Sequence, residues 1–552
     1  MKKILYRFIL SLLFSHFLLF ISIGQPLHQK KEFTHADTLR GTITPERAWW
    51  DVTHYNLQVS FNFNKRSIAG YNIISYKIVS APAKEMQVDL QAGLDIDSVI
   101  YENKSLSFRR DGNAYFVAVP SAANKAKTQM IAVYYHGIPR PALHPPWDGG
   151  VIWSKDEKGN PWISVACQGL GASVWYPCKD HQSDEPDSAS LSMIVPDTLT
   201  AIANGRLRNE MNNGDGTSTY TWAVTNPINN YNITPYIGKY AHWHEDYDGE
   251  KGKLDCDFWV MEYNVDKAKV QFKQALQMLH CFEHWFGPYP FYEDGYKLIE
   301  APHLGMEHQS AVAYGNGFAN GYKGTDLSGT GWGLKWDFII VHESGHEWFG
   351  NSITTKDVAD MWVHEGFTNY SETIFTTCEY GKEAGNDYVI GTRKRIQNDK
   401  PIQGPYGVNQ EGSGDMYYKG GNLVHTIRQI INNDSSFRML LRGMNKTFYH
   451  QTVTGKQIEE YISKTSGIDF SKVFDQYVRT TQIPVLEYKV KGNKLSYRWT
   501  NCVKGFNMPL KINFGDEKWI KPTQKWKTLK IKKGEKNEFS ADRNFYIHTK
   551  KL

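Results

Sequence analysis

The sequence lacks several patterns that settle the class of many proteins. Its six cysteines form no CxxC pair, so a cysteine-based metal site or redox motif is unsupported. The glycine-rich stretch at residues 314–333 lacks the GK[ST] ending of a phosphate-binding loop, and we interpret it as a connection. No internal repeat is present. Redox, nucleotide-binding and repeat architectures are therefore not indicated.

The chain also lacks a strong excess of charge. The formal net charge is +5 over 552 residues, and Lys2, Lys3 and Arg7 near the start carry three of the positive charges. Such a nearly neutral body gives no argument for a nucleic-acid partner. Basic residues are concentrated in the last 64 positions, which contain 17 Lys and Arg but only 5 Asp and Glu. They alternate with apolar residues, which is typical of strands with one solvated face.

Long apolar runs are absent except at the start. Residues 1–24 combine the three basic residues with an apolar stretch and a small-x-small ending before Gln25, which predicts a secretory signal peptide cleaved after Gly24. An uncleaved membrane anchor is the alternative. We expect an exported protein, periplasmic, cell-surface or extracellular, with no stable membrane span after signal cleavage.

An exported protein could oxidise its cysteines, but their positions do not suggest a disulfide framework. They lie at 167, 178, 256, 281, 378 and 502, and Cys167 with Cys178 is the closest pair in the sequence. We expect no bridge.

The length and the apolar periodicity predict several domains. A chain of 552 residues is too long for one core. Residues 25–245 have alternating, strand-like patterns, including a hairpin signal at 55–63 and 71–79. Residues 246–480 have mainly helical patterns, beginning with a helix that ends at Gly287. Residues 481–552 return to strand patterns. The sequence therefore predicts a multidomain α+β protein.

The stretch "VHESGHEWFG" has metal-ligand spacing. On a helix, His342 and His346 lie about 40° apart on one face, so that two imidazoles can bind one ion. The carboxylate of Glu343 can then contact a water molecule bound to that ion. Gly345 would allow a second element to approach closely. A helix with two hydrogen-bonded histidines is the alternative, but this spacing favours zinc.

A third ligand follows nineteen positions after His346. Glu365 begins a second helical pattern, and Glu372 lies two turns further on the same face, where it can accept a hydrogen bond from a zinc-bound histidine. His364 is a competing ligand, but it should point elsewhere because it is rotated by 100° from Glu365. Two helices crossing at Gly345 would complete a His2Glu site.

"HESGHEWFGN" followed by "WVHEGF" resembles the gluzincin zinc aminopeptidases, the family of aminopeptidase N and leukotriene hydrolase. "DVTHYNLQV", "FGPYPFYEDGYKLIEAP" and "DQYVRTTQIPVLEY" extend the resemblance over most of the chain. It implies an N-terminal antiparallel β saddle domain, a thermolysin-like, mainly helical catalytic domain and a small C-terminal β-sandwich. The large C-terminal helical domain of many members is not expected after residue 480.

The resemblance also implies a site for the substrate's amino terminus. The family's GxMEN motif corresponds to residues 304–308, LGMEH, in which Met306 and Glu307 match and His308 replaces the asparagine. Glu307 can pair with a free α-ammonium group, and the backbone at Gly305 can lie against the peptide as an added strand. Gln168 occupies the place of a family residue that also helps to bind the amine.

In the family, one residue separates the transition-state tyrosine from a following Lys-Gly pair, and this spacing selects Tyr417 over Tyr418 in "MYYKGG". The expected activity is that of a zinc metallo-aminopeptidase, with one Zn²⁺ per chain and Glu343 as general base, acting on peptides with a free N-terminus. A thermolysin-like endopeptidase, an epoxide hydrolase and a secreted binding protein with lost catalysis are the alternatives.

Overall fold

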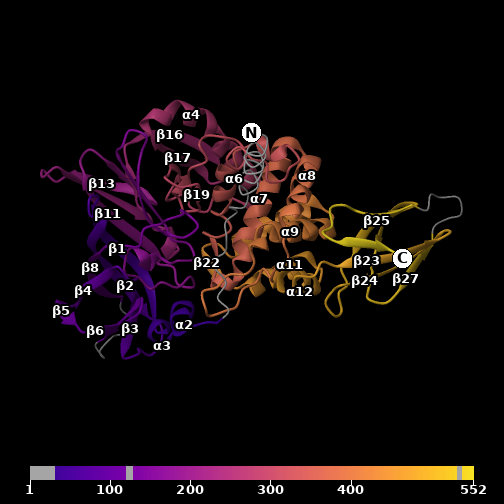
Figure 1. Ribbon diagram of the computed structural model, residues 1–552, viewed down its shortest axis with the longest axis horizontal. Helices are drawn as coiled ribbons and strands as arrows, with labels where there is room; N and C mark the ends of the chain where they lie inside the picture. Colours follow the sequence, from indigo (N-terminus) through magenta and orange to yellow (C-terminus); the bar gives the residue numbers. More distant parts are fainter. Residues whose placement is uncertain (1–31, 120–127, 531–537) are drawn as a thin grey trace, which may run out of the picture.

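The computed structural model describes residues 32–119, 128–530 and 538–552, so the predicted signal peptide at residues 1–24 lies outside the described residues. Along the longest axis, a β-rich part, a helical part and a small β-rich part follow one another in chain order (Figure 1). This arrangement confirms the predicted α+β class, with an N-terminal β domain, a mainly helical middle and C-terminal sheets.

The N-terminal part contains two short helices followed by strands in three sheets. The elements are α2 (His35–Gly41), α3 (Pro45–Ala48), β1 (Trp50–Asn62), β2 (Ser67–Ile78), β3 (Glu85–Asp89), β4 (Leu94–Tyr101), β5 (Lys104–Leu106), β6 (Phe108–Asp111), β7 (Ala114–Ala118), β8 (Gln129–Gly137), β9 (Gly150–Lys155), β10 (Pro161–Ala166), β11 (Ser188–Pro196), β12 (Thr200–Ile202), β13 (Arg206–Asn212), β14 (Thr217–Val224) and β15 (Tyr236–Gly238). The sheet orders are β13-β14-β11-β1-β2-β8-β4-β5, β12-β15-β10-β9 and β3-β7-β6.

The predicted hairpin is present, because β1 and β2 pair antiparallel with Tyr55 opposite Ile74. Tyr55, Leu57 and Val59 alternate with less buried residues and face the core. One pairing departs from the antiparallel prediction, since β1 and β11 are parallel. The chain passes through other sheets between these strands, and a crossover of that length allows the parallel direction.

A five-stranded sheet joins the N-terminal part to the helices. It consists of β16 (Tyr240–Gly249), β17 (Gly252–Met261), β18 (Tyr296–Glu300), β19 (Gly305–Met306) and β20 (Val312–Tyr314), in the order β16-β17-β18-β20-β19. Ile299 and Met306 pack in the N-terminal core, whereas Leu298 and Val312 pack in the core of the helices. The domain boundary predicted at 245 falls within β16. Strand β19 therefore lies at a free sheet edge between the two cores.

The helical part surrounds the functional residues. Its elements are α4 (Val265–Gln271), α5 (Lys273–Phe286), α6 (Phe338–Gly345), β21 (Ile353–Thr355), α7 (Trp362–Tyr380), α8 (Lys382–Thr392), α9 (Tyr418–Ile431), α10 (Asp434–Thr447), β22 (Gln451–Val453), α11 (Gly455–Ser466) and α12 (Ser471–Arg479). The predicted helix end at Gly287 is present, where φ is +98° after α5. Only a residue without Cβ adopts that backbone readily.

The C-terminal part contains two packed sheets. Its strands are β23 (Val485–Lys491), β24 (Lys494–Thr500), β25 (Leu510–Phe514), β26 (Asp516–Ile520), β27 (Lys527–Lys530), β28 (Phe539–Ala541) and β29 (His548–Lys551), in the orders β27-β24-β23-β29 and β26-β25-β28. Leu486, Trp499 and Ile512 belong to the same continuous core as the helices. The C-terminal sheets therefore share a core with the helices of the middle part.

The expectation of no disulfide was wrong. Cys281 on α5 and Cys378 on α7 form a bridge across 97 residues, whereas Cys167 and Cys178 are buried free thiols. Sequence spacing could not predict this bridge, because the packing of α5 against α7 brings the two cysteines together. The bridge fastens α7 to a neighbouring helix.

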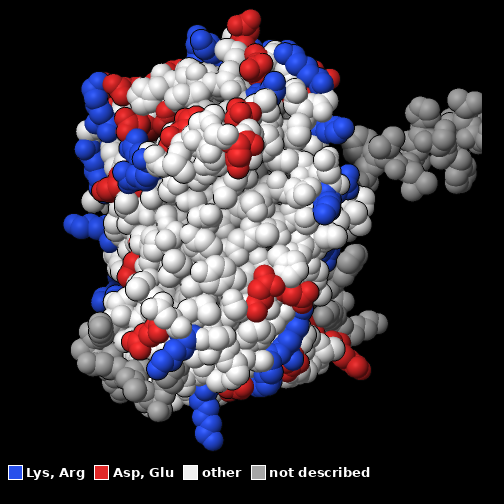
Figure 2. Space-filling view, turned by 90° about the vertical axis from the view of Figure 1, so that its left-hand side faces the viewer, with Lys and Arg blue, Asp and Glu red and all other residues white. Residues whose placement is uncertain are grey.

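No helix among the described residues is long and apolar enough to cross a membrane. Figure 2 views the molecule from the end occupied by the N-terminal part. Charged side chains of both signs gather toward the top and bottom of this face, and a broad area between them is largely uncharged. Among the described residues on this face, Lys and Arg side chains are interspersed with Asp and Glu (Figure 2).

Candidate active site

Helix α6 carries the HExxH residues into the interior. Asp337 caps it by accepting hydrogen bonds from the backbone N–H groups of Ile339 and Ile340 at 3.0 and 3.4 Å. All eight residues of α6 are buried. A Cβ on Gly345 would lie 2.5 Å from Ser371 Oγ on α7. The missing side chain therefore allows α7 to cross α6, as the sequence predicted.

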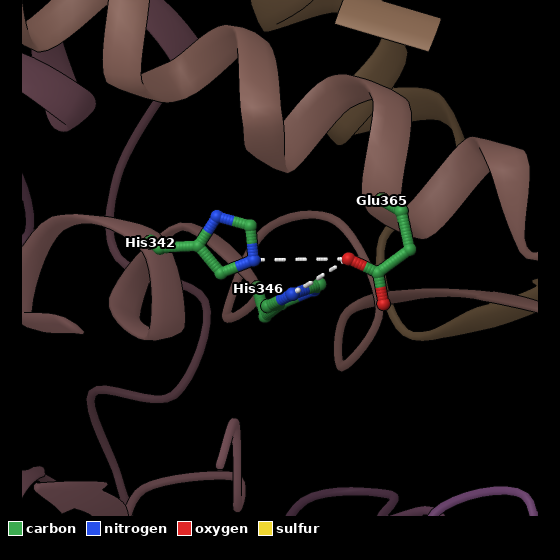
Figure 3. A group of neighbouring side chains, drawn as sticks. All are labelled: His342, His346 and Glu365. Atoms are coloured by element: carbon green, nitrogen blue, oxygen red, sulfur yellow. Dashed lines mark ion pairs between the residues drawn. The ribbon is translucent and has the colours of Figure 1, made fainter. Parts of the chain in front are cut away.

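His342, His346 and Glu365 converge from these two helices (Figure 3). Glu365 Oε2 lies 3.7 Å from His342 Nε2 and 3.4 Å from His346 Nε2. Two ligands of a tetrahedral zinc, each bonded at about 2.0–2.1 Å, are about 3.3–3.4 Å apart. Glu365 Oε2 is also buried and accepts no hydrogen bond within the described structure. An orphaned carboxylate oxygen facing two imidazoles fits a zinc ion.

The electrostatics of Glu365 favour its charged form. Burial alone would raise the pKa of this carboxyl, but the two imidazoles outweigh burial and hold the pKa well below its usual range. A permanently ionised carboxylate is the form that binds a metal.

Hydrogen bonds behind the histidines fix their orientation. His342 Nδ1 lies 2.8 Å from Glu372 Oε1, the partner predicted from the sequence. Asn369 and Tyr388 also donate to Glu372, at 2.9 and 2.6 Å. His346 Nδ1 lies 2.9 Å from the backbone oxygen of Phe349. Both Nδ1 atoms are thereby engaged, so that both Nε2 atoms remain for the metal.

The competing ligand His364 faces elsewhere. Its Nε2 atom accepts a hydrogen bond from the backbone N–H of Thr355 at 2.8 Å. The side chain is fully buried and does not line the cavity described below. His364 and Glu365 therefore point in different directions from α7, as the rotation of 100° between adjacent helical residues predicted.

Glu343 lies between the histidines and the edge strand β19. A Cβ on Gly305 would lie 2.7 Å from Glu343 Oε1 and 2.9 Å from Ile339 Cγ2, so the missing side chain leaves room for the Glu343 carboxylate beside β19. Burial raises the pKa of Glu343 above its ordinary value, although His342 opposes the rise. This placement gives Glu343 access to any group held between the metal ligands and β19.

Glu307 forms a second polar centre beside the first. The amide of Gln168 donates a hydrogen bond to Glu307 Oε1, and the hydroxyl of Tyr231 donates to the same atom at 3.0 Å. Asn351 Nδ2 donates to the backbone oxygen of Glu307 at 2.8 Å. Tyr231 and Asn351 were missed from the sequence, because neither is adjacent to Glu307 along the chain.

His308, the departure from the family motif, lies behind the site. It is fully buried, and its Nδ1 is 2.5 Å from the hydroxyl of Tyr236. Leu304, the other departure, lines the cavity, whereas His308 does not. The side chain at position 308, where the family motif has asparagine, therefore faces the protein interior.

Tyr417 and Tyr418 both border the site from the start of α9. The ring of Tyr417 stacks on His342 with centroids 5.9 Å apart. Burial raises the pKa of Tyr417 well above its ordinary value, and Glu365 adds to the rise. The Tyr417 phenol therefore keeps its proton and can donate a hydrogen bond.

One cavity of about 170 Å³ unites these groups. Gln168, Gly305, Met306, Glu307, Glu343, Tyr417 and the three metal-ligand residues all line it, and Glu372 stands behind His342. Among the described lining residues, four are glutamates and none is lysine or arginine. The structure thus gathers the sequence-predicted residues into one acidic cavity beside a free strand edge.

Two family models match the chain. One is described as the peptidase M1 N-terminal domain and matches residues 52–231; the other is described as the peptidase family M1 domain and matches residues 271–477. Together they cover more than half of the chain. The second match includes every metal-ligand residue.

Similar proteins match this chain at low identity. "Probable aminopeptidase 2" of Sulfurisphaera tokodaii is 21% identical over 468 residues, which are 81% of this chain and 55% of the relative. Leukotriene A-4 hydrolase of Xenopus laevis is 20% identical over 446 residues, covering 76% and 68%. This chain thus spans only about half of the first relative's length.

A solved M1 zinc metallopeptidase from Deinococcus radiodurans, bound to a Tyr-Ser-Ala substrate, has the same fold. The TM-score is 0.67 at 19% identity, and the match covers 79% of this chain and 96% of that one. At this identity, the likeness concerns the fold alone.

Proposed function

Because the chain belongs to the peptidase M1 family, we propose that it is a zinc aminopeptidase that removes the N-terminal residue of peptides. The observation that carries the proposal is the position of Glu307. Its carboxylate is held by Gln168 and Tyr231 in the cavity that also contains the metal-ligand residues. A charged anchor at that place can hold a free α-ammonium group next to the reacting bond.

We propose one zinc ion per chain, held by His342, His346 and Glu365. When bound, zinc supplies Lewis acidity for a water molecule and for the substrate carbonyl. The alternative grouping of Glu307, Glu343 and His346 also has close ligand atoms. It leaves His342 unused and places two carboxylates in the metal's shell beside one imidazole, which fits zinc's usual ligands less well.

The protein's own residues then have distinct tasks. Glu343 takes a proton from the attacking water and passes it to the leaving amine nitrogen as the peptide C–N bond breaks. The Tyr417 hydroxyl donates a hydrogen bond to the carbonyl oxygen while negative charge develops there. Glu307 and Gln168 bind the substrate's ammonium group. The backbone of β19 binds the peptide as an added strand.

The direct test compares free aminoacyl reporters with their N-acetylated forms, with and without a chelator. The wild type should cleave free reporters at least tenfold better than acetylated ones, and only when zinc is present. Glu307→Ala should reduce kcat/KM for free reporters by about thirtyfold to a thousandfold, because an unpaired buried charge costs about 2 to 4 kcal/mol. Zinc content should stay the same.

The alternatives give different results in the same assay. An endopeptidase with this zinc site would cleave acetylated peptides as well as free ones. A binding protein without catalysis would cleave neither in the presence of zinc. Epoxide hydrolysis would need a separate epoxide substrate, and no contact in the cavity favours it over peptide hydrolysis.

We also propose that the protein is exported. The Cys281–Cys378 bridge supports this location, because disulfides persist mainly in oxidising compartments such as the periplasm or the extracellular space. Fractionation of cells that express the full chain, with detection of the oxidised bridge by thiol labelling, tests the proposal. Recovery of the protein in the cytoplasm with reduced Cys281 and Cys378 would refute it.

A further inference from the structure

A short turn of the N-terminal part holds Glu307 at its carboxylate and at its backbone. The 3-10 turn Asn230–Asn232 contains Tyr231 and Asn232, and both of these side chains are buried. The hydroxyl of Tyr231 donates a hydrogen bond to the Glu307 carboxylate at 3.0 Å. The side chain of Asn232 acts on the backbone of Glu307 through Asn351. The proposed reaction assigns no role to Asn232.

The amide of Asn351 links Asn232 to Glu307. Asn351 Nδ2 donates a hydrogen bond to the backbone oxygen of Glu307 at 2.8 Å, and it lies 3.4 Å from Glu347 Oε2. Asn232 Nδ2 donates to Asn351 Oδ1 at 2.7 Å. Both asparagine side chains are fully buried, where hydrogen bonds are electrostatically stronger than in water. We call this pair of hydrogen bonds the Asn232–Asn351 link.

The direction of the Asn232–Asn351 link is fixed by the atoms at its end. A backbone carbonyl oxygen accepts hydrogen bonds and cannot donate them, so the NH2 group of Asn351 must face Glu307. The oxygen of the Asn351 amide then faces Asn232, which must donate to it. If Asn232 presented an acceptor instead, the preferred orientation of the Asn351 amide would be the reverse one. Asn232 therefore selects the orientation of the Asn351 amide.

The backbone on either side of Glu307 is held by other groups. Met306 belongs to β19, which pairs antiparallel with β20. The backbone oxygen of Gln309 accepts a hydrogen bond from Asn204 Nδ2 at 2.7 Å. Between these two fixed points, the peptide that follows Glu307 is held by Asn351. The orientation of this peptide determines where the Glu307 carboxylate lies in the cavity.

We infer that Asn232 is a positioning residue for the binding of the substrate's amino terminus. By orienting Asn351, it fixes the peptide of Glu307 and hence the place of the carboxylate that binds the α-ammonium group. The inference rests on the proposed aminopeptidase function and gives the N-terminal part a contribution to recognition of that group. A displaced carboxylate binds the ammonium group less well, whereas the residues that act on the carbonyl keep their geometry.

The variant Asn232→Asp tests the direction of the link. It keeps the shape of the side chain but replaces the donor by an acceptor, so that the Asn351 amide loses its partner. We expect kcat/KM for a free leucyl reporter to fall by about fivefold to fiftyfold, as for the loss of a buried hydrogen bond. The loss should appear mainly in KM, with unchanged zinc content. Wild-type kinetics in this variant would overturn the inference.

Asn230→Asp is the matched control from the same turn. Asn230 is also buried, and its Nδ2 donates to the backbone oxygen of Lys179 at 2.7 Å. The variant therefore loses an equivalent hydrogen bond that does not lead to Glu307. It should lower the thermal midpoint about as much as Asn232→Asp does, with little change in kcat/KM. An equal kinetic loss in the two variants would show that the turn as a whole sets the activity, which would refute the role of Asn232.

A double-mutant cycle with Glu307 separates positioning from a structural role. If Asn232 acts through Glu307, Asn232→Asp should have little further effect on kcat/KM in a Glu307→Ala enzyme. A structural role would lower kcat/KM by the same factor in both backgrounds. Such additivity would refute the inference, even if Asn232→Asp alone reduced the activity.

Binding gives a readout independent of turnover. Zinc-loaded Glu343→Gln should bind leucinamide about tenfold or more tightly than 4-methylpentanamide, which has the same skeleton without the amine. Adding Asn232→Asp should reduce this preference severalfold in calorimetry, and an unchanged preference would contradict the inference. If the wild type prefers free reporters and Asn232→Asp keeps that preference, only the inference fails. If the wild type cleaves acetylated reporters as well as free ones, the proposed function fails too.

Discussion

Glu365 Oε2 is the atom on which the metal assignment depends. It faces two imidazole nitrogens and has no hydrogen-bond donor among the described residues. We expect His346→Ala and Glu365→Ala to lose both zinc and activity. Glu343→Gln should retain one zinc per chain and lose turnover by orders of magnitude, because it removes only the proton acceptor. Metal analysis of purified variants, together with reporter assays, checks this pattern.

The same variants separate the two possible groupings of ligands. If zinc were held by Glu307, Glu343 and His346, Glu343→Gln would lose the metal and Glu365→Ala would keep it. Full zinc retention in His346→Ala would contradict both groupings. The measurement therefore identifies the ligands as well as the metal.

One substitution at each position shows whether Tyr417 or Tyr418 is the hydrogen-bond donor to the developing oxyanion. Loss of an oxyanion donor typically costs about 2.7 to 4 kcal/mol, so Tyr417→Phe should lower kcat about a hundredfold or more with little change in KM. Tyr418→Phe should have a mild effect. Steady-state kinetics of the two variants decides between them, and the reverse ranking would show that the spacing rule selected the wrong tyrosine.

Single residues were predictable where a motif fixed their spacing. His342, His346 and Glu365 lie on helices whose periodicity is visible in the sequence, and the structure brings them together. Glu372 could be found for the same reason. Tyr231 and Asn351 could not, because they reach Glu307 from other parts of the chain. Such contacts depend on tertiary packing, for which the sequence shows no local pattern.

At the scale of elements, the site depends on close helix crossings. Gly366 on α7 and Gly420 on α9 face each other, and a Cβ on Gly420 would lie 2.8 Å from Gly366 Cα. Gly366 follows the ligand Glu365, and Gly420 is three residues after Tyr417. This crossing therefore sets the distance between the metal ligand and the tyrosine.

Gly420→Ala should separate α7 from α9. Alanine raises helix propensity by about 1 kcal/mol, but overpacking costs about 1–3 kcal/mol and displaces the backbone. We expect at least a tenfold loss of kcat/KM and weaker zinc binding. Gly443→Ala on α10 is the control, since its Cβ would meet only the tip of Tyr461. Equal kinetics in the two variants would rule out this role for the crossing.

Individual helices and strands were more predictable than the distant segments with which they pair. Alternation predicted β1 and β2 and their hairpin, and helical spacing predicted the helices that carry the ligands. The parallel pairing of β1 with β11 and the Cys281–Cys378 bridge were not predicted. Both join segments that are distant in sequence, and periodicity does not specify which distant segments meet.

At the scale of the whole molecule, buried histidines make stability depend on pH. His425 on α9 is fully buried and lies 3.1 Å from both Tyr370 and Asn544. Burial lowers its pKa to about 3, whereas the pKa in an unfolded chain is about 6.5. Below pH 6.5 the unfolded chain gains a proton that the folded protein does not. The contribution of neutral, buried His425 to the free energy of unfolding is therefore fully present above pH 6.5. It is lost as the pH falls toward 3.

His425→Gln should reduce this sensitivity to acid. At pH 5 the unfolded wild type gains about 2 kcal/mol from protonating this histidine, and glutamine does not titrate. The loss of unfolding free energy between pH 7.5 and pH 5 should be smaller by about that amount in the variant, as measured by urea denaturation. His280→Gln, exposed on α5, should behave like the wild type. Identical losses in both variants would contradict the prediction.

The core shared by the helices and the C-terminal sheets makes the last strands part of the packing that supports the catalytic part. Arg393 donates to the backbone oxygens of Arg543 and Asn544 at 2.7 and 2.8 Å, and Tyr477 donates to that of Tyr546 at 2.6 Å. Cleavage near residue 480 would expose apolar surface on both fragments. The C-terminal sheets are therefore held to the helices by a shared core and hydrogen bonds, unlike a module on a linker.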